Sequence, residues 1–244
     1  MDSLKNLDHE IVSCRKCPRL VAFRERVARE KRRQFHDWEY WGKPVPGFGD
    51  PNASLLIVGL APAPHGGNRT GRIFTGDRSG DFLISALHKA GFASQSLSES
   101  RSDGLTLRNA YLTAAVKCAP PDNKPAPVEV GNCSPYLSRE LDLLKETRVI
   151  LCLGQLAFNS VMDTVARHQQ SPRFRHKFAH GLEVSLGLRA PTVFASYHPS
   201  PRNTQTGKLT REMFLSLLAR VQRRLRKNPQ RFARTVRQNM EGPK

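Results

Sequence analysis

An apolar run that turns directly into a glycine-rich loop is the sequence feature that most limits how this chain can fold. The run covers residues 54–58, and the loop extends over residues 59–77. A short buried strand that opens into such a loop is typical of α/β proteins, whose active sites lie at the carboxyl ends of their strands. The loop has neither the Gly-Lys-Ser/Thr end of a P-loop nor the Gly-x-Gly-x-x-Gly of a dinucleotide-binding loop. The sequence therefore predicts an α/β fold whose site is of another kind.

Further apolar runs alternate with segments of helical periodicity. The runs cover residues 110–116, 149–153 and 192–196, and the helical patterns cover residues 82–90, 136–145, 155–166 and 214–221. This alternation predicts a three-layer α/β/α sandwich with a mainly parallel central sheet. The loops that begin at residues 59, 117 and 197 each follow one of the expected strands. Because the carboxyl ends of parallel strands share one edge, we expect these loops to meet in one crevice.

The sequence carries a large excess of positive charge. Its 244 residues include 39 Lys and Arg against 21 Asp and Glu, which gives a formal net charge of +18. Such an excess predicts a polyanionic partner, most commonly a nucleic acid. No apolar run approaches the roughly 18 residues that span a bilayer, and the N-terminus has no signal-peptide core. We therefore expect a cytoplasmic protein that does not bind membranes.

The domain organisation follows from the same patterns. Residues 1–227 are expected to form one domain, because no internal repeat or linker divides them. Residues 228–244 lack apolar periodicity and are rich in basic side chains, so they are expected to be a mobile tail. The aromatic side chains Trp38, Tyr40 and Trp41 could stack on bases, but we expect their segment to pack against the core.

Five cysteines, an odd number, argue against a disulfide framework. Cys14 and Cys17 form a C-x2-C pair, Cys118 and Cys133 follow far along the chain, and Cys152 lies inside an apolar run. Four of them are therefore candidate metal ligands, and Cys152 is interpreted as a core residue. The spacing matches neither a zinc ribbon nor a ferredoxin motif, so zinc and an iron–sulfur cluster both remain open.

Four motifs give the sequence a specific resemblance. They are YWGKPVPGFGD at residues 40–50, the loop at residues 59–77 with Ser79 and Gly80, KCAPPDNKP at residues 117–125 and HPSPRNTQTGKL at residues 198–209. With the cysteines, they cover most of the chain from residue 14 to residue 209. In these motifs the chain resembles the fifth family of uracil-DNA glycosylases, the type-b iron–sulfur enzymes.

The resemblance implies a uracil-DNA glycosylase-like fold and a monofunctional DNA repair enzyme. Such an enzyme flips uracil out of double-stranded DNA and hydrolyses the bond to the sugar, which leaves an abasic site. It also implies a prokaryotic, monomeric protein with a structural [4Fe–4S] cluster that ties the N-terminal segment to the domain. The cluster would be held by Cys14, Cys17, Cys118 and Cys133. A competing interpretation is a non-enzymatic nucleic-acid-binding module built on a zinc site at the same four cysteines.

Roles for the base-binding residues follow from the resemblance. Phe74 would stack on the flipped base, although it could instead only support the loop. Asn123 offers the donor and acceptor that the amide edge of uracil requires, although Asn is also a common turn residue. Gly59 and Ala61 are expected to contribute to the same base pocket. His198 would donate a hydrogen bond to the carbonyl oxygen that gains charge as the base departs.

Asp77 is the only carboxylate in the first loop. Its charge could position a water molecule or stabilise the sugar cation, or it could only cap the following helix. Related families carry an Asp, Asn or Glu directly after the strand, where this chain has Leu60, Ala61 and Pro62, and the fourth family has an Asn where this chain has Ala114. These losses of polar side chains predict a broader specificity that includes hypoxanthine.

Phosphate contacts are predicted for five residues of the two long loops. Basic and hydroxyl side chains there can bind DNA irrespective of its sequence. The predicted DNA-binding residues are Arg69, Arg72, Ser200, Arg202 and Lys208.

Overall fold

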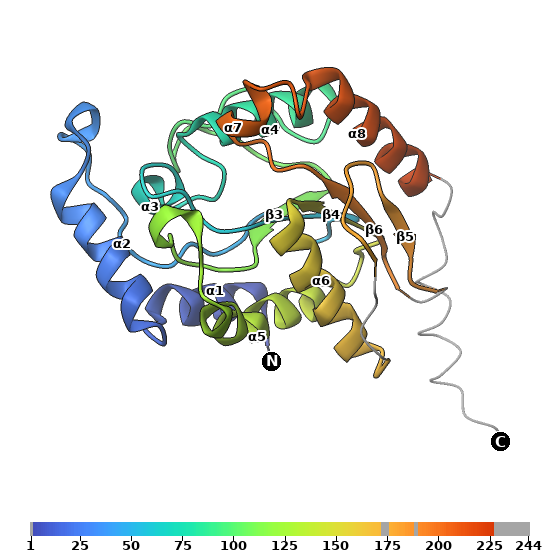
Figure 1. The fold of residues 1–244 in the computed structure, drawn as a ribbon, viewed down its shortest axis with the longest axis horizontal. Coiled ribbons are helices and arrows are strands. Elements are labelled where there is room, and N and C mark those ends of the chain that lie inside the picture. The colour runs from blue at the N-terminus through green and yellow to red at the C-terminus, as the bar shows by residue number, and fades with distance from the viewer. Residues whose placement is uncertain (1, 172–175, 188–189, 227–244) are drawn as a thin grey trace.

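The computed structural model describes residues 2–171, 176–187 and 190–226, and its centre is a single six-stranded sheet (Figure 1). The strand order is β1-β3-β2-β4-β6-β5. The four inner strands are parallel: β2 (Leu55–Gly59), β3 (Ala110–Ala114), β4 (Val149–Leu153) and β6 (Thr192–Ser196). They are the four strands that the apolar runs predict. The antiparallel edge strands β1 (Phe48–Gly49) and β5 (Glu183–Ser185) were not predicted, since two or three residues are too few to show a period.

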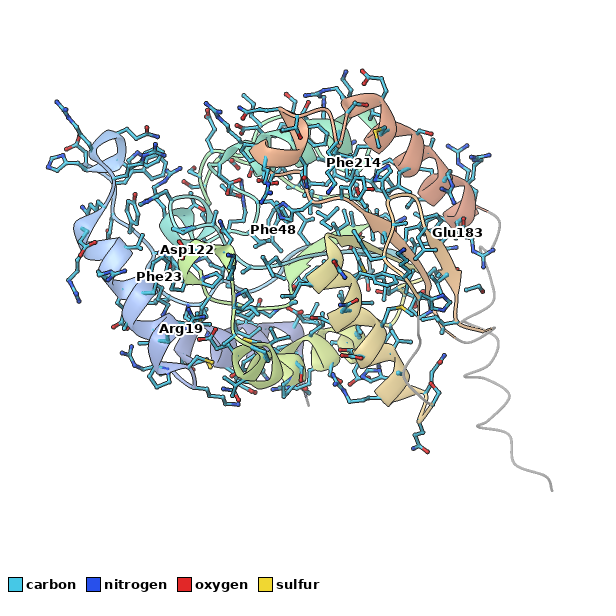
Figure 2. All side chains as sticks on the ribbon, in the orientation of Figure 1. Arg19, Phe23, Phe48, Asp122, Glu183 and Phe214 are labelled. Carbon is cyan, nitrogen blue, oxygen red and sulfur yellow. The ribbon has the colours of Figure 1, made fainter. Side chains whose placement is uncertain are left out.

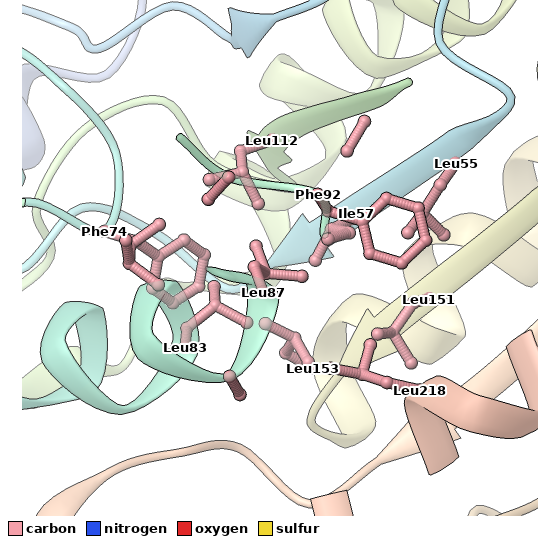
Figure 3. Packing of buried hydrophobic residues seen from close by; sticks show 14 of the residues in the cluster. Leu55, Ile57, Phe74, Leu83, Leu87, Phe92, Leu112, Leu151, Leu153 and Leu218 are labelled. Atoms are coloured by element: carbon pink, nitrogen blue, oxygen red, sulfur yellow. The ribbon is translucent and has the colours of Figure 1, made fainter. Parts of the chain in front are cut away.

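Every residue of the four inner strands is buried, because helices cover both faces of the sheet. Alternate side chains of β2 point to opposite faces: Leu55 and Ile57 pack with α4 and α8, whereas Leu56 and Val58 pack with α5 and α6. Figure 3 shows part of the first cluster, with Leu83 of α4 beside the strand residues. The predicted three-layer α/β/α sandwich is confirmed.

Four helices form the two outer layers next to the sheet. They are α4 (Arg78–Lys89), α5 (Pro127–Leu143), α6 (Gln155–His168) and α8 (Arg211–Arg226). The start of α5 differs most from the prediction, which placed it at residue 136, and α4 and α8 begin three or four residues before the predicted patterns. Pro127 fits the first turn of a helix because its missing N–H is not needed there. Pro135 is tolerated inside α5 because the hydroxyl of Ser134 donates to the carbonyl of Gly131 at 3.0 Å, the acceptor that Pro135 leaves without a backbone donor.

Two further helices bring the N-terminal segment onto the domain. Helix α1 (Leu4–Ser13) packs along α5, and α2 (Pro18–Glu30) continues to the one-turn helix η1 (Arg33–Phe35) (Figure 1). Leu7 and Ile11 are fully buried in this contact. The segment after α2 differs in part from the prediction that it packs against the core. Tyr40 is buried, but Trp38 is 37% exposed.

Short helical turns occur in the loops at the carboxyl edge of the sheet. They are α3 (Gly67–Thr70), η2 (Pro121–Asn123) and α7 (Pro201–Thr204). None of the helices within the described ranges is long and apolar enough to cross a bilayer. The predicted tail at residues 228–244 lies outside the described residues.

Candidate active site

The three loops that the sequence predicts to converge line one cavity of about 1360 Å³. The loop after β2 contributes Ala61, Phe74 and Asp77, the loop after β3 contributes Asn123, and the loop after β6 contributes His198. All three loops leave the carboxyl ends of parallel strands, so their convergence is a direct result of the sheet topology. The predicted crevice is confirmed, and its size is sufficient for a nucleotide.

Phe74 is held in a strained backbone conformation at one wall of the cavity. Its φ of 51° lies in the left-handed region, which a bulky residue rarely adopts. The ring lies directly over Gly59, where a Cβ atom would be 2.7 Å from Cζ of Phe74. The ring is also 6.2 Å from the ring of His198, at an interplanar angle of 31°. Strain of this kind persists where the surroundings enforce it and is common at ligand-binding sites.

Replacing Gly59 by alanine is therefore expected to destabilise the protein by about 1–3 kcal/mol, because the new methyl group overlaps the ring of Phe74. The matched control is Gly131→Ala in α5, where a Cβ meets nothing within 4 Å. The control is expected to stabilise the helix by about 0.5–1 kcal/mol. Urea unfolding measures both changes. Equal midpoints for the two variants would contradict the proposed packing of Phe74 on Gly59.

Gly59 itself does not line the cavity. It is buried behind Phe74, and its carbonyl accepts a hydrogen bond from the N–H of Ala115 at 3.0 Å. The predicted direct contact of Gly59 with the base therefore does not fit the structure. Gly59 acts on the pocket through Phe74, which needs the space that a side chain would fill. Ala61 does line the cavity.

His198 lies two residues after β6, with its ring lining the cavity. Asn203 fixes the backbone there, because its side-chain amide donates to the carbonyl of His198 at 2.8 Å. On the other side the backbone of Gly154 approaches closely, so that a Cβ would lie 3.4 Å from Cβ of His198. Burial lowers the pKa of His198 to about 4. The imidazole is therefore neutral at pH 7, and it can donate a hydrogen bond without carrying charge.

Asp77 caps helix α4 and also reaches the cavity. Its Oδ1 accepts hydrogen bonds from the N–H groups of Ser79 at 2.9 Å and Gly80 at 3.0 Å. Its Oδ2 lies so close to Gly66 that any Cβ there would overlap it. Burial raises the pKa of the carboxyl group, while the two backbone donors and Arg69 oppose that rise. The capping role is real, and it leaves one oxygen of the carboxylate beside the cavity.

Asn123 stands at the rim of the cavity in a second strained segment. Both Asp122 and Asn123 have left-handed backbones, with φ values of 52° and 55°. Figure 2 labels Asp122 on this loop. The side chain of Asn123 is exposed and has no hydrogen-bond partner within the described residues. Asn tolerates this conformation better than most residues, so the turn role and the base-reading role both fit the geometry.

Comparison with known proteins identifies the family. The family model for the uracil DNA glycosylase superfamily matches residues 46–222. The chain belongs to this superfamily. It is 50% identical to a type-5 uracil-DNA glycosylase of Thermus thermophilus, over 87% of this chain and 94% of the relative. It is 46% identical to a type-5 enzyme of Pyrobaculum aerophilum, over 87% and 89%.

A type-4 uracil-DNA glycosylase of Archaeoglobus fulgidus is 33% identical, over 82% of this chain and 83% of the relative. The type-5 relatives share more of the sequence than this type-4 relative does. Within the uracil DNA glycosylase superfamily, the chain therefore groups with the type-5 enzymes, as the motifs of the sequence predict.

The phosphate-binding role predicted for Arg72 does not fit its position. It is only 4% exposed, and it does not line the cavity. Its guanidinium donates to the hydroxyls of Thr75 and Ser98 and forms an ion pair with Asp103 at 2.6 Å. These bonds tie the glycine-rich loop to residues 98–103. A phosphate could replace them only if this buried network were broken.

Arg69 is also buried, but it lies in the cavity wall. Its Nε and Nη2 donate to the carbonyls of His65 at 2.8 Å and Gly76 at 2.9 Å. The guanidinium lies 3.8 Å from the ring centre of Phe35 and 4.1 Å from that of Trp38. A direct contact of Arg69 with an exposed phosphate, as predicted, therefore does not fit its 3% exposure. Its charge still contributes to the potential of the cavity.

Ser200, Arg202 and Lys208 remain candidates for DNA contacts in the superfamily fold. Ser200 and Arg202 line the cavity, and Arg202 is exposed. Lys208 is exposed as well, with its ammonium group 4.9 Å from the ring centre of Tyr197. These positions leave the side chains accessible to a phosphate backbone.

The segment after α2 also contributes to the cavity. Arg32, Phe35, Trp38 and, from the first loop, His65 all line it. Trp38 was expected to pack against the core, with stacking on bases as the alternative. A signal was present at positions 31–41, where three basic residues are followed closely by four aromatic residues, because basic and aromatic side chains together are common on nucleic-acid-binding surfaces.

The four cysteines predicted as ligands come together in the structure. Cys14, Cys17, Cys118 and Cys133 all line one small cavity of about 10 Å³ between the N-terminal helices and the body of the domain. No group of three or more His, Cys, Asp or Glu side chains in the described part of the chain is arranged to hold a single metal ion. Cys152 is fully buried in β4, in agreement with its predicted core role.

Two polar side chains donate toward the sulfur atoms. Nη1 of Arg24, a residue that is 2% exposed, lies 2.8 Å from Sγ of Cys118. Nδ2 of Asn132 lies 3.4 Å from Sγ of Cys17. A buried guanidinium next to sulfur is unfavourable unless negative charge is present. A set of thiolate ligands with these donors fits a bound metal centre.

Proposed function

We propose that this protein is a monofunctional DNA glycosylase that flips uracil out of double-stranded DNA and hydrolyses its N-glycosidic bond. The observation that carries the proposal is the convergence of Phe74, Asp77 and His198 on one cavity in a chain of the type-5 family. The net charge of +18 supports a DNA partner. The product is an abasic site. Since the relatives come from bacteria and archaea, we place the reaction in a prokaryotic cytoplasm.

Each side chain has a task in this reaction. The ring of Phe74 stacks on the flipped base, and Asn123 bonds the amide edge that distinguishes uracil. In the transition state the base gains negative charge and the sugar gains positive charge. The neutral His198 donates to the base oxygen that becomes negative, and the carboxylate of Asp77 stabilises the sugar cation or positions the attacking water.

Base release from duplex oligonucleotides tests the proposal. The purified protein is expected to release free uracil from a duplex with one uracil and to leave an alkali-labile abasic site. Activity should survive EDTA, because no step uses a divalent ion. Tight DNA binding with no release of uracil would support the non-enzymatic alternative. We further propose that residues 1–227 act as one monomeric domain, which size-exclusion chromatography with light scattering can test.

We infer that the four cysteines hold a [4Fe–4S] cluster. Four thiolates are the ligand set that such a cluster requires, and donors from Arg24 and Asn132 next to the sulfurs are typical of its surroundings. When bound, the cluster would link Cys14 and Cys17 of the N-terminal segment to Cys118 and Cys133 of the domain. Its contribution would be to stability and not to electron transfer.

Cys118→Ser is expected to lose iron and to unfold at lower temperature, because one of four ligands is removed. Cys152→Ser is the matched control, since Cys152 is buried in β4 away from the ligand cavity, and it should retain the full iron content. Iron and sulfide analysis with absorption near 400 nm measures the outcome. Stoichiometric zinc without iron in anaerobically purified protein would contradict the cluster and favour the zinc alternative.

We also propose that the enzyme releases hypoxanthine. Leu60 and Ala61 line the cavity and have no polar groups that a purine would leave unpaired, and Ala114 is buried at the end of β3. Discrimination by a pocket depends on such groups, so their absence reduces the penalty for a larger ring. Leaving-group stabilisation by His198 serves a purine anion as well.

Single-turnover release of hypoxanthine is therefore expected to be detectable with duplexes that differ from the uracil substrate only in the lesion. An enzyme that strictly requires uracil would show none. Leu60→Asn and Ala114→Asn restore polar groups and are expected to reduce hypoxanthine release more than uracil release. Robust uracil release with no detectable hypoxanthine release by the wild-type protein would show that the missing side chains do not broaden specificity.

A further inference from the structure

One wall of the cavity carries donors that the proposed base chemistry does not use. It is formed by the segment after α2 and by the start of the loop after β2. The residues of this wall are Arg32, Phe35, Trp38, His65 and Arg69. The proposed base subsite is formed by other residues of the same cavity, Phe74 and His198, whose rings lie 6.2 Å apart.

The tautomer of His65 is set by Tyr40. The hydroxyl of Tyr40, which is 8% exposed, accepts a hydrogen bond from the N–H of Arg32 at 3.3 Å. The same hydroxyl lies 3.1 Å from Nδ1 of His65. Within the described residues Nδ1 is the only acceptor available to the phenolic proton, and a buried hydroxyl proton needs one. Tyr40 therefore donates to Nδ1, and the neutral imidazole carries its own proton on Nε2.

His65 is held in its neutral form. Burial and the positive charges of Arg32 and Arg69 together lower its pKa. The ring lines the cavity, and Nε2 has no hydrogen-bond partner within the part of the chain that the structure describes. His65 thus offers the cavity a neutral N–H donor of fixed orientation. Its backbone is fixed as well, since the carbonyl accepts from Nε of Arg69 at 2.8 Å.

The surroundings of this donor favour an anion. Arg69 is buried between Phe35 and Trp38, and among the described residues its Nη1 has no hydrogen-bond partner. Arg32 adds a second positive charge to the same wall. None of the five residues of this wall is acidic, and the carboxylate of Asp77, in the same cavity, interacts electrostatically with Arg69. A DNA backbone phosphate, with two non-bridging oxygens, is the acceptor that a flipped nucleotide brings to the cavity entrance.

We propose that Nε2–H of His65 binds a non-bridging oxygen of a backbone phosphate in the strand that carries the flipped nucleotide. Tyr40 is a positioning residue, which acts by fixing the imidazole tautomer. The proposal rests on the proposed function, since it takes uracil-containing DNA as the ligand. Uracil release by the wild-type protein tests that function separately, so either proposal can fail alone.

Binding to a duplex that contains uncleavable 2′-fluoro-2′-deoxyuridine tests the contact. His65→Ala is expected to weaken binding of the cluster-loaded protein about fivefold to tenfold at every salt concentration, as loss of one neutral hydrogen bond does. The slope of log Kd against log salt should not change, because a neutral donor releases no counterion. His88→Ala, at an exposed position in α4, is the control and should bind as the wild type does.

Two amide variants separate the ring nitrogens. The amide nitrogen of His65→Gln falls near the position of Nε2, whereas that of His65→Asn falls near Nδ1. We expect Gln to restore most of the binding and Asn to restore little. Equal binding by the Gln and Asn variants, or a salt slope reduced by about one, would overturn the neutral Nε2–H contact.

Neutral methylphosphonates identify the phosphate. Each phosphate near the uracil is replaced in turn, and the loss due to His65→Ala is measured on every duplex. At one position, and in the diastereomer whose methyl group replaces the contacted oxygen, the loss should vanish, because the partner is already absent. An undiminished loss at every position would overturn the phosphate contact and indicate a contact with the base or sugar.

The tautomer is read from ¹⁵N–¹H correlation spectra of labelled histidine. The wild-type ring of His65 should be protonated on Nε2, and Tyr40→Phe should show both tautomers with a smaller loss of binding than His65→Ala. A wild-type ring protonated on Nδ1 would overturn the positioning role of Tyr40.

Discussion

Replacing His198 by alanine is expected to slow uracil release about 100- to 1000-fold while DNA binding changes little. The hydrogen bond from His198 strengthens only as the departing base gains charge, so it stabilises the transition state more than the bound substrate. The imidazole is suited to this task because burial lowers its pKa to about 4. A neutral donor does not need to lose a proton or rearrange solvent when the negative charge develops.

Single-turnover rates at saturating enzyme measure the effect, and binding to an uncleavable duplex provides the comparison. His198→Gln keeps an N–H donor and should retain more activity than His198→Ala. Because the pKa is lowered, the ring is neutral above about pH 4, and titration of His198 should produce no step in the rate between pH 5 and pH 8. An unchanged rate in His198→Ala, or a parallel loss of binding, would contradict this role.

The central sheet was predictable because its inner strands are buried on both faces. Runs such as residues 149–153 are continuously apolar, and a parallel strand between two helical layers requires that pattern. Helix α1 was missed although Leu4, Leu7 and Ile11 follow helical spacing after the capping residue Ser3. The other residues of α1 are mostly polar or charged, because the helix buries only a narrow apolar stripe against α5. The helical spacing is therefore hard to recognise in the sequence.

The site was predicted in its position but only partly in its roles. Arg69 and Arg72 were expected to face DNA, yet Arg69 donates to carbonyls of its own loop and Arg72 donates to hydroxyls of Thr75 and Ser98. A long loop with little secondary structure must find partners for its backbone groups, and Arg69 provides two of them. Sequence alone does not show which basic side chains are used internally. The same limit applies to His65, whose orientation depends on Tyr40, a distant residue in the sequence.

The glycines of the first loop serve packing more than flexibility. At four of them an added Cβ would overlap a neighbouring group: the ring of Phe74, the carboxylate of Asp77, the ring of Trp41 and the guanidinium of Arg69. These glycines are Gly59, Gly66, Gly71 and Gly76. The glycines of the loop therefore allow site residues to approach the backbone closely.

Asp77→Asn is expected to slow uracil release by about 100-fold or more while leaving the protein as stable as the wild type. The two functions of Asp77 can be separated because they use different properties of the side chain. Capping of α4 needs only Oδ1 as an acceptor, and Asn caps helices about as well as Asp. Stabilisation of a sugar cation or activation of water needs the negative charge, which Asn lacks.

The pH dependence of uracil release also separates the charge role of Asp77 from its capping role. Burial raises the pKa of Asp77, so the carboxylate of the wild-type enzyme is protonated at a higher pH than an ordinary Asp as the solution is acidified. The rate of the wild type should therefore fall on the acid side, and that fall should be absent in Asp77→Asn. Because burial disfavours the charged carboxylate of Asp77, this charge lowers the stability of the folded protein at neutral pH. The Asn variant should therefore unfold at an equal or higher urea concentration.

Single-turnover kinetics across pH and urea unfolding of the same preparations make the test. Asp142→Asn, at an exposed position on α5, controls for the loss of one carboxylate and should match the wild type in both measurements. Asp77→Ala removes charge and cap together, so it should be slow and also less stable by about 1 kcal/mol. Unchanged excision by Asp77→Asn would leave Asp77 with the capping role alone, and the proton or charge chemistry would then have to come from water held by the backbone of the first loop.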